Sequence, residues 1–240
     1  MKILGIETAT AICSAAVIVD SVHCYERSLS TPQIHSQKLL TLIDDVFRLA
    51  KETIDSVDGI AVSIGPGSFT GLRIGLSVAK GLAYASDKPI LAVPTLETLA
   101  WNARDHAGTT GSLPIVTVLE SRRGEVYAAF YRNTKNGTVN LLPPCSMTYD
   151  ALYSTCMEYG EVIITGAGAE KALGYFRDSY SKGIHVHLMP EEDRLCNAKL
   201  VAEGGEKLLR NKILADVSSL EPTYVKEFYT IQQSQLTIGN

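Results

Sequence analysis

The sequence predicts an α/β fold built from two similar halves, each with the element order βββαβαβα. Short apolar runs alternate with stretches of helical period, which is typical of strands and helices arranged in layers. This order occurs twice along the chain, and the first strand of each half ends on an acid, Glu7 or Glu120. The shared order indicates an internal duplication that is visible in the elements rather than in residue identity.

Strands in the first half are expected where apolar runs are bounded by turn residues, such as Asp20-Ser21 and Gly65-Pro66-Gly67. Helices are expected where apolar residues recur every three to four positions, as at Leu39, Ile43 and Val46. The expected strands are 2–7, 12–19, 22–29, 59–64 and 90–93. The expected helices are 35–50, 70–86 and 95–104.

The second half follows a polar, glycine-containing stretch at 105–112, and its turn Gly166-Ala167-Gly168 corresponds to the glycine turn of the first half. The expected strands are 114–119, 125–132, 138–142, 161–165 and 184–188. The expected helices are 148–158, a helix from the glycine turn to about 178, and 197–210. We therefore expect domains at 1–108 and 109–240, with helix 197–210 able to pack back on the first domain and with a polar tail.

Composition excludes several classes of protein. The chain has 240 residues, of which 45% are hydrophobic, and this rules out a disordered or fibrous chain. Its 22 Lys and Arg against 26 Asp and Glu give a net charge of −4, whereas an autonomous nucleic-acid binder usually carries a basic surplus. If the protein serves RNA or DNA, we expect a partner to supply the positive surface.

Neither a disulfide framework nor a membrane span is expected. The five cysteines are an odd number without a Cys-x-x-Cys pair, which also argues against a zinc ribbon. No apolar run approaches the roughly 18 residues of a membrane span, and Glu7 comes too early for a signal peptide. We therefore expect a cytoplasmic protein with no membrane partner, no metal and no other cofactor.

The most informative motif is Gly65-Pro66-Gly67-Ser68-Phe69-Thr70-Gly71-Leu72-Arg73, between a buried strand and a helix. Glycines and a helix N-terminus can form an anion-binding nest, although the same residues also suit a tight strand-to-helix turn. The motif is not a Walker A loop, because no Gly-Lys-Ser/Thr ends it. The possible anion- or nucleotide-binding residues are Glu7, Thr8, Thr10, Gly65, Gly67 and Ser68.

The helix after this motif carries small residues every four positions, Gly71, Gly75 and Ala79. Because glycine in a helix costs about 1 kcal/mol against alanine, these positions need a compensating close contact. That contact is either with the protein's own sheet or with another subunit, through this helix and helix 35–50. The interface residues expected in the second case are His35, Leu39, Leu42, Val46, Thr70, Gly71, Leu72, Arg73, Gly75, Leu76, Ala79 and Ala83.

These segments resemble the TsaB (YeaZ) family. The resemblance is carried by residues 5–8 (Gly-Ile-Glu-Thr), by His35 at a helix start, and above all by residues 65–75. Residues 121–127 and Pro222-Thr223-Tyr224 extend it over most of the chain. The resemblance implies a duplicated actin-like, sugar-kinase-like ATPase fold.

The resemblance also implies a function, that of the non-catalytic dimerisation subunit of the bacterial machinery that makes N6-threonylcarbamoyladenosine at position 37 of tRNAs reading codons that begin with A. The implied partners are the catalytic paralogue TsaD, which binds TsaB through first-domain helices, and the ATPase TsaE. A homodimer is implied when the paralogue is absent. Contact with tRNA is expected to be only indirect.

Two other functions remain open at this point. A stand-alone ATP-dependent kinase of the same fold needs a carboxylate for metal or general-base work, which Glu7 or Glu120 would supply unless they are only strand-end polar residues. Arg122 and Arg123 either line a cleft between the halves or are solvated turn residues. Lys226 stands where the family often has arginine.

A metallopeptidase is improbable. Catalytic relatives resembling TsaD have two histidines four residues apart on a helix, whereas Leu39 stands four residues after His35 here. His35 is therefore expected to cap its helix or to contact a partner. His185 and His187 share one face of a strand, and we expect no metal there.

Overall fold

The computed structural model describes residues 1–30, 34–106, 113–121, 124–134, 137–181 and 183–225. It contains two five-stranded sheets stacked with helices, in the orders β3-β2-β1-β4-β5 and β8-β7-β6-β9-β10. In each sheet the first three strands form an antiparallel meander, and the first strand pairs parallel with the fourth. The identical strand order confirms the duplicated α/β fold.

The strands of the first sheet are β1 (Lys2–Glu7), β2 (Cys13–Val19), β3 (His23–Leu29), β4 (Gly59–Gly65) and β5 (Ile90–Pro94). Those of the second sheet are β6 (Ile115–Glu120), β7 (Glu125–Thr134), β8 (Gly137–Thr148), β9 (Glu161–Thr165) and β10 (His185–Leu188). Strand β8 is longer than expected, because it continues past Pro143-Pro144 through two register shifts against β7. An edge strand tolerates these prolines, since its outer N–H groups need no ladder partner.

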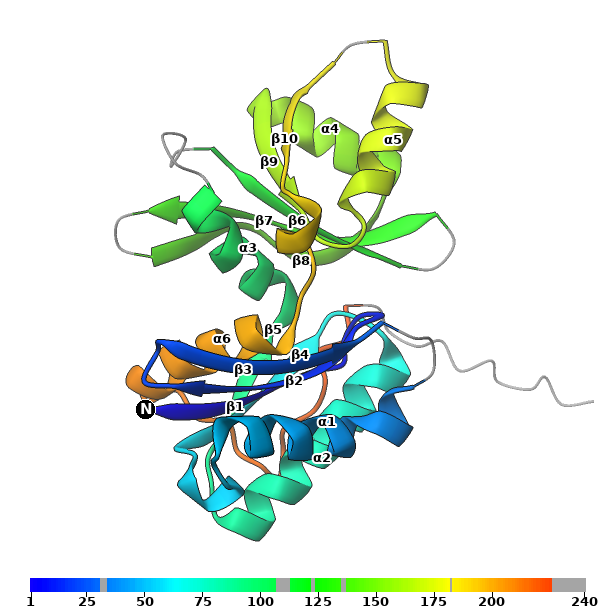
Figure 1. Ribbon diagram of the computed structural model, residues 1–240. Coiled ribbons are helices and arrows are strands. Elements are labelled where there is room, and N and C mark those ends of the chain that lie inside the picture. The colour runs from blue at the N-terminus through cyan, green and yellow to red at the C-terminus, as the bar shows by residue number, and fades with distance from the viewer. Residues whose placement is uncertain (31–33, 107–112, 122–123, 135–136, 182, 226–240) are drawn as a thin grey trace, which may run out of the picture.

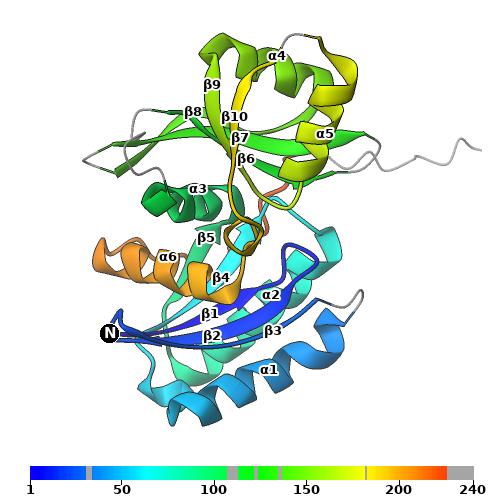
Figure 2. The same ribbon diagram turned by 45° about the horizontal axis from the view of Figure 1, so that its top comes forward.

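The helices are α1 (His35–Ala50), α2 (Phe69–Ser86), α3 (Thr95–His106), α4 (Tyr149–Tyr159), α5 (Ala169–Ser179) and α6 (Ala198–Arg210), with short 3₁₀ turns at Ile54–Ser56 and Glu191–Asp193. Helices α1 and α2 cover the outer face of the first sheet, and α4 and α5 cover the outer face of the second (Figures 1 and 2). Helices α3 and α6 lie between the two sheets. One continuous apolar core therefore joins the halves across this middle layer.

The two middle helices are exchanged between the halves. Helix α3, which follows the first sheet in sequence, packs against β6, β7 and β9 of the second, whereas α6 packs against β1, β2 and β4 of the first. A Cβ on Gly5 of β1 would lie 2.2 Å from the carbonyl oxygen of Ala198, and one on Gly205 would lie 2.4 Å from the Cβ of Ala61. These glycines allow α6 to lie directly on the sheet. Part of the expected boundary, 107–112, lies outside the described residues.

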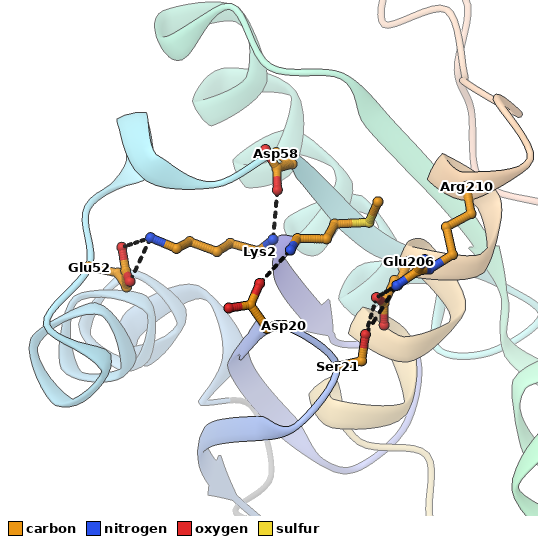
Figure 3. A network of polar contacts seen from close by, with 8 residues as sticks. Lys2, Asp20, Ser21, Glu52, Asp58, Glu206 and Arg210 are labelled. Carbon is orange, nitrogen blue, oxygen red and sulfur yellow. Dashed lines mark hydrogen bonds and ion pairs between the residues drawn. The ribbon is translucent and has the colours of Figure 1, made fainter.

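A polar network fastens α6 and the end of α1 to the first sheet (Figure 3). The carboxylate of Glu206 accepts hydrogen bonds from Ser21, in the β2–β3 turn, and from Arg210. Burial alone would raise the pKa of Glu206, but these hydrogen bonds outweigh it, and the pKa lies below its ordinary value. Lys2 Nζ pairs with Glu52 at 2.8 Å, so charged groups from distant segments meet at one end of β1.

After α6 the chain returns along the first sheet to the glycine motif; we call residues 213–225 the C-terminal strap. Ala215 N donates to the carbonyl of Ile90 at 3.1 Å, so the strap bridges to the edge strand β5. Thr223 N then donates to the carbonyl of Ile64 at 2.7 Å. The polar tail expected after residue 229 and the position of Lys226 lie outside the described residues.

Candidate functional site

The glycine motif before α2 encloses the loop that follows β1. Ser68 N donates to the carbonyl of Ala9 at 2.7 Å. A Cβ on Gly67 would lie 2.2 Å from that same oxygen, and a Cβ on Gly71 would lie 2.0 Å from the carbonyl oxygen of Thr8. The glycines are needed here because the backbone of the β1–β2 loop occupies the space that a side chain would fill.

The carboxylate of Glu7 is buried at the end of β1 and is hydrogen-bonded within the chain. Its Oε1 accepts from Ala9 N at 2.6 Å and Thr10 N at 3.2 Å, and its Oε2 accepts from the Cys196 thiol at 3.2 Å. Burial raises the pKa of Glu7 above its ordinary value, while the hydrogen bonds from Cys196, Ser63 and the two amides oppose the shift. Glu7 thus holds the β1–β2 loop to the segment that enters α6.

His35 holds the same loop from the side of α1. Its Nε2 lies 3.2 Å from the carbonyl oxygen of Thr10, and the side chain is nearly buried. No side-chain hydrogen bond caps the start of α1 at Ile34. The expectation that His35 caps its helix is therefore wrong, because the ring binds the β1–β2 loop inside the chain. Contact of His35 with a partner stays a prediction.

The six possible anion-binding residues lie close together, and their contacts fit a strand-to-helix turn. Gly65 N donates to Thr95 Oγ1 at 3.2 Å. The Oγ of Ser68 accepts from Gly71 N at 3.2 Å and so caps α2. Thr8 is fully buried beneath α2. These contacts favour the alternative of a strand-to-helix turn, which surrounds the chain's own loop, and anion binding stays a prediction.

Most residues expected at a subunit interface are buried inside this chain. A Cβ on Gly75 would lie 2.1 Å from Thr8 Oγ1, so this glycine serves the packing of α2 over β1. Of that set, only Thr70 and Arg73 are exposed. The other ten are buried within this chain, and their place at a subunit interface stays a prediction: His35, Leu39, Leu42, Val46, Gly71, Leu72, Gly75, Leu76, Ala79 and Ala83.

A different stripe of small residues lies on the exposed side of α2. Ser77, Gly81 and Ala85 recur every four positions and are all exposed, and a Cβ on Gly81 would meet nothing within 4 Å. Large apolar side chains are also exposed on the two helices, with Tyr84 of α2 at 88% and Leu40 of α1 at 61% exposure. We call these five residues the α1–α2 outer face. Sequence periodicity had pointed to the opposite, buried side of α2.

At the start of α2, Arg73 lies among aromatic rings contributed by distant segments. Its guanidinium carbon is 3.9 Å from the centroid of the Phe69 ring, and its Nε donates to the Tyr224 hydroxyl at 3.0 Å. The Phe69 and Tyr224 rings lie 5.4 Å apart. Tyr224 belongs to the C-terminal strap, and sequence reasoning gave it no role because 151 positions separate it from Arg73.

The second half places few of its expected groups together. Glu120, the counterpart of Glu7, is exposed and pairs with Lys171 at 3.0 Å. His187 is likewise exposed, with its Nε2 2.7 Å from Glu161. Within the described part of the chain, no group of three or more His, Cys, Asp or Glu is arranged to hold a metal. Arg122 and Arg123 lie outside the described residues.

Comparison with known proteins gives a consistent picture. Residues 30–174 match the model of the family TsaD, described as tRNA N6-adenosine threonylcarbamoyltransferase. The chain is 36% identical over 137 residues to the tRNA threonylcarbamoyladenosine biosynthesis protein TsaB of Escherichia coli, covering 57% of this chain and 58% of that protein. It is 33% identical over 144 residues to TsaB of Bacillus subtilis, covering 60% of each. The chain thus spans less than two thirds of the length of these relatives.

Solved structures extend the similarity to the fold of nearly the whole chain. YeaZ from Pseudomonas aeruginosa superposes with a TM-score of 0.74 at 23% identity, covering 93% of this chain and 99% of that one. A second structure from the same organism, described as similar to the peptidase YEAZ, gives a TM-score of 0.75. Among the described residues, none of the helices has the length and apolar character to cross a membrane.

Proposed function

Because this chain belongs to the family of the tRNA N6-adenosine threonylcarbamoyltransferase TsaD, and within it to the TsaB (YeaZ) group, we propose that it takes part in the synthesis of N6-threonylcarbamoyladenosine at position 37 of tRNA. We assign it the role of a non-catalytic subunit that assembles with a catalytic paralogue of the TsaD type. The ATPase of the TsaE type joins that assembly, and the chain forms a homodimer when the paralogue is absent.

The α1–α2 outer face is the observation that carries this proposal. Leu40 of α1 and Tyr84 of α2 expose large apolar side chains, and Gly81 of α2 is exposed without a side chain. Because a Cβ on Gly81 would meet no atom of the described residues within 4 Å, no contact among them compensates the helix-propensity cost of about 1 kcal/mol for this glycine. Small residues beside exposed apolar ones suit the close approach of a helix from another subunit.

The arrangement around Glu7 supports a role without catalysis. Its two carboxylate oxygens accept hydrogen bonds from Ala9, Thr10 and Cys196, and the side chain is fully buried. A kinase would need this group to reach a metal–phosphate group or a substrate proton. The net charge of −4 further supports an indirect contact with tRNA, in which the paralogue supplies the positive surface.

The test is assembly with the purified catalytic paralogue, measured by gel filtration and by restoration of tRNA modification. Leu40→Asp and Gly81→Arg should leave the melting temperature within about 3 °C of wild type, since both sites are exposed. Both should abolish the complex and the restored activity. Matched controls are Leu188→Asp on β10 and Gly174→Arg on α5, a second helical glycine with open space around it.

Two outcomes would argue against this role. Assembly that survives both outer-face variants would remove the α1–α2 outer face from the interface. ATP turnover by the isolated chain, abolished by Glu7→Gln, would favour the stand-alone kinase instead. A metallopeptidase predicts that a chelator lowers the melting temperature, whereas the assembly subunit should show no change.

A further inference from the structure

We propose that Arg73 is the anchor for an acidic side chain of the protein partner, and that Phe69 and Tyr224 position it for that contact. The inference rests on the proposed function and names the chemistry of one contact in it. It requires that Arg73 be held in one orientation, that it carry an unused charge, and that it border the α1–α2 outer face.

Arg73 is held from two directions. The Phe69 ring lies under the guanidinium at 3.9 Å, a distance at which a cation is attracted to the ring face. The Tyr224 hydroxyl accepts from Nε at 3.0 Å, which fixes the rotation of the guanidinium plane. Together these contacts leave Nη1 and Nη2 as the forked end, which matches the two oxygens of a carboxylate.

Tyr224 is itself fixed, because the C-terminal strap is anchored beside it. Thr223 N donates to the carbonyl of Ile64 at 2.7 Å. A Cβ on Gly65 would lie 2.7 Å from the carbonyl oxygen of Thr223, so the strap lies directly on the glycine turn. The strap and the glycine motif therefore form one unit that presents Arg73.

The charge of Arg73 has no carboxylate partner among the residues that the structure describes. Other arginines in the described chain do pair: Arg48 with Asp44 and Asp45, and Arg210 with Glu206. An arginine that is ordered by aromatic rings, rather than by an acid, retains its full charge for an incoming group. Binding then requires little further ordering of the side chain.

Arg73 also lies on the correct side of α2. Residues 73, 77 and 81 follow one another at four-residue spacing along the exposed side of the helix. A partner helix that packs on Ser77 and Gly81 therefore passes over Arg73 at the N-terminal end of α2. Charge complementarity favours an aspartate or glutamate at that point of the partner.

The test measures binding of the purified TsaD-type paralogue by titration calorimetry at low and high salt. Arg73→Gln should raise Kd at least about tenfold, and Arg73→Lys less, because lysine keeps the charge but loses the fork. Tyr224→Phe keeps the ring and removes one hydrogen bond, so Kd should rise about threefold to tenfold. The double variant Arg73→Gln/Tyr224→Phe should bind the paralogue no more weakly than Arg73→Gln alone. The control Arg177→Gln, on α5, should bind it as tightly as wild type does.

A second readout separates this inference from the proposed function. In the free protein, the ¹⁵N signal of Arg73 Nε should shift in Tyr224→Phe while the melting temperature stays within about 3 °C. Wild-type chain that fails to bind the paralogue would overturn the proposed function. Four results would each overturn the role of Arg73. Two concern affinity: binding that Arg73→Gln leaves unaffected, and additive effects of the two substitutions in the double variant. The other two are an unshifted ¹⁵N signal of Arg73 Nε in Tyr224→Phe, and an effect on binding that appears only when tRNA is present.

Discussion

Two glycines of helix α2 should respond in opposite ways to the same substitution. Gly71 faces the β1–β2 loop, whereas Gly81 faces solvent. Replacing either with alanine removes the conformational entropy cost of glycine, which by itself stabilises the folded protein by at most about 1 kcal/mol. The surroundings of the new methyl group therefore decide the sign of each effect.

At Gly81 the methyl group meets nothing within 4 Å, so Gly81→Ala should stabilise the protein by about 0.5–1 kcal/mol. At Gly71 it would lie 2.0 Å from the carbonyl oxygen of Thr8, well inside the 3.0 Å that real Cβ contacts respect. That oxygen belongs to a loop fixed by Glu7 and His35. The displaced backbone should cost about 2–4 kcal/mol, which leaves Gly71→Ala less stable by about 1–3 kcal/mol.

Urea denaturation followed by far-ultraviolet circular dichroism measures both free energies of unfolding. In thermal unfolding, Gly81→Ala should raise the melting temperature by about 2–4 °C and Gly71→Ala should lower it by more than that. An alanine at 71 that is as stable as wild type would show that the β1–β2 loop yields to the methyl group. Equal effects at the two positions would refute the assignment of the buried and exposed sides of α2.

Three further predictions concern single side chains. As the pH rises above 4.5, Glu7→Gln should become more stable relative to wild type, by up to about 1.4 kcal/mol per pH unit. The reason is that burial raises the pKa of Glu7, so the folded wild-type protein keeps a proton that its unfolded chain releases. Urea denaturation across a pH series measures this, and parallel pH profiles of the free energy of unfolding for the two proteins would contradict it. Ala79→Arg should unfold the chain or destabilise it by more than about 4 kcal/mol, since residue 79 is fully buried, and a cooperative melting transition near that of wild type would be the contrary result. Asp150→Ala should lower the pKa of Tyr180 from about 12 toward its ordinary value of 10.0, because the Tyr180 hydroxyl donates to Asp150 at 2.5 Å; tyrosinate absorbance measures this, and an unchanged titration would show that the hydrogen bond does not control the ionisation.

The elements were predictable because each carries a local signal. Apolar residues at helical spacing identify α1, and the run ending at Glu7 identifies β1. One strand was predicted too short. It was expected to end at residue 142, but β8 continues through Pro143 and Pro144 to Thr148, because an edge strand tolerates bulges and prolines.

The candidate site was harder to predict, because α2 carries two stripes of small residues. Gly75 and Ala79 belong to one, Gly81 and Ala85 to the other, and spacing alone does not tell which stripe faces the sheet. Tertiary contacts decide this, through the β1–β2 loop that lies against Gly75. The pairing of Arg73 with Tyr224 depends on the return of the chain after α6, which has no local sequence signal.

The exchange of α3 and α6 between the halves has a consequence for the newborn chain. The apolar side of the first sheet that includes Ile3 and Leu91 is covered by α6, whose residues 198–210 are synthesised long after the strands themselves. On the ribosome this surface therefore stays uncovered until the second half has been made, and a chain released earlier is a substrate for chaperones or proteases. A fragment meant to isolate the first half has to carry α6 as a linked segment.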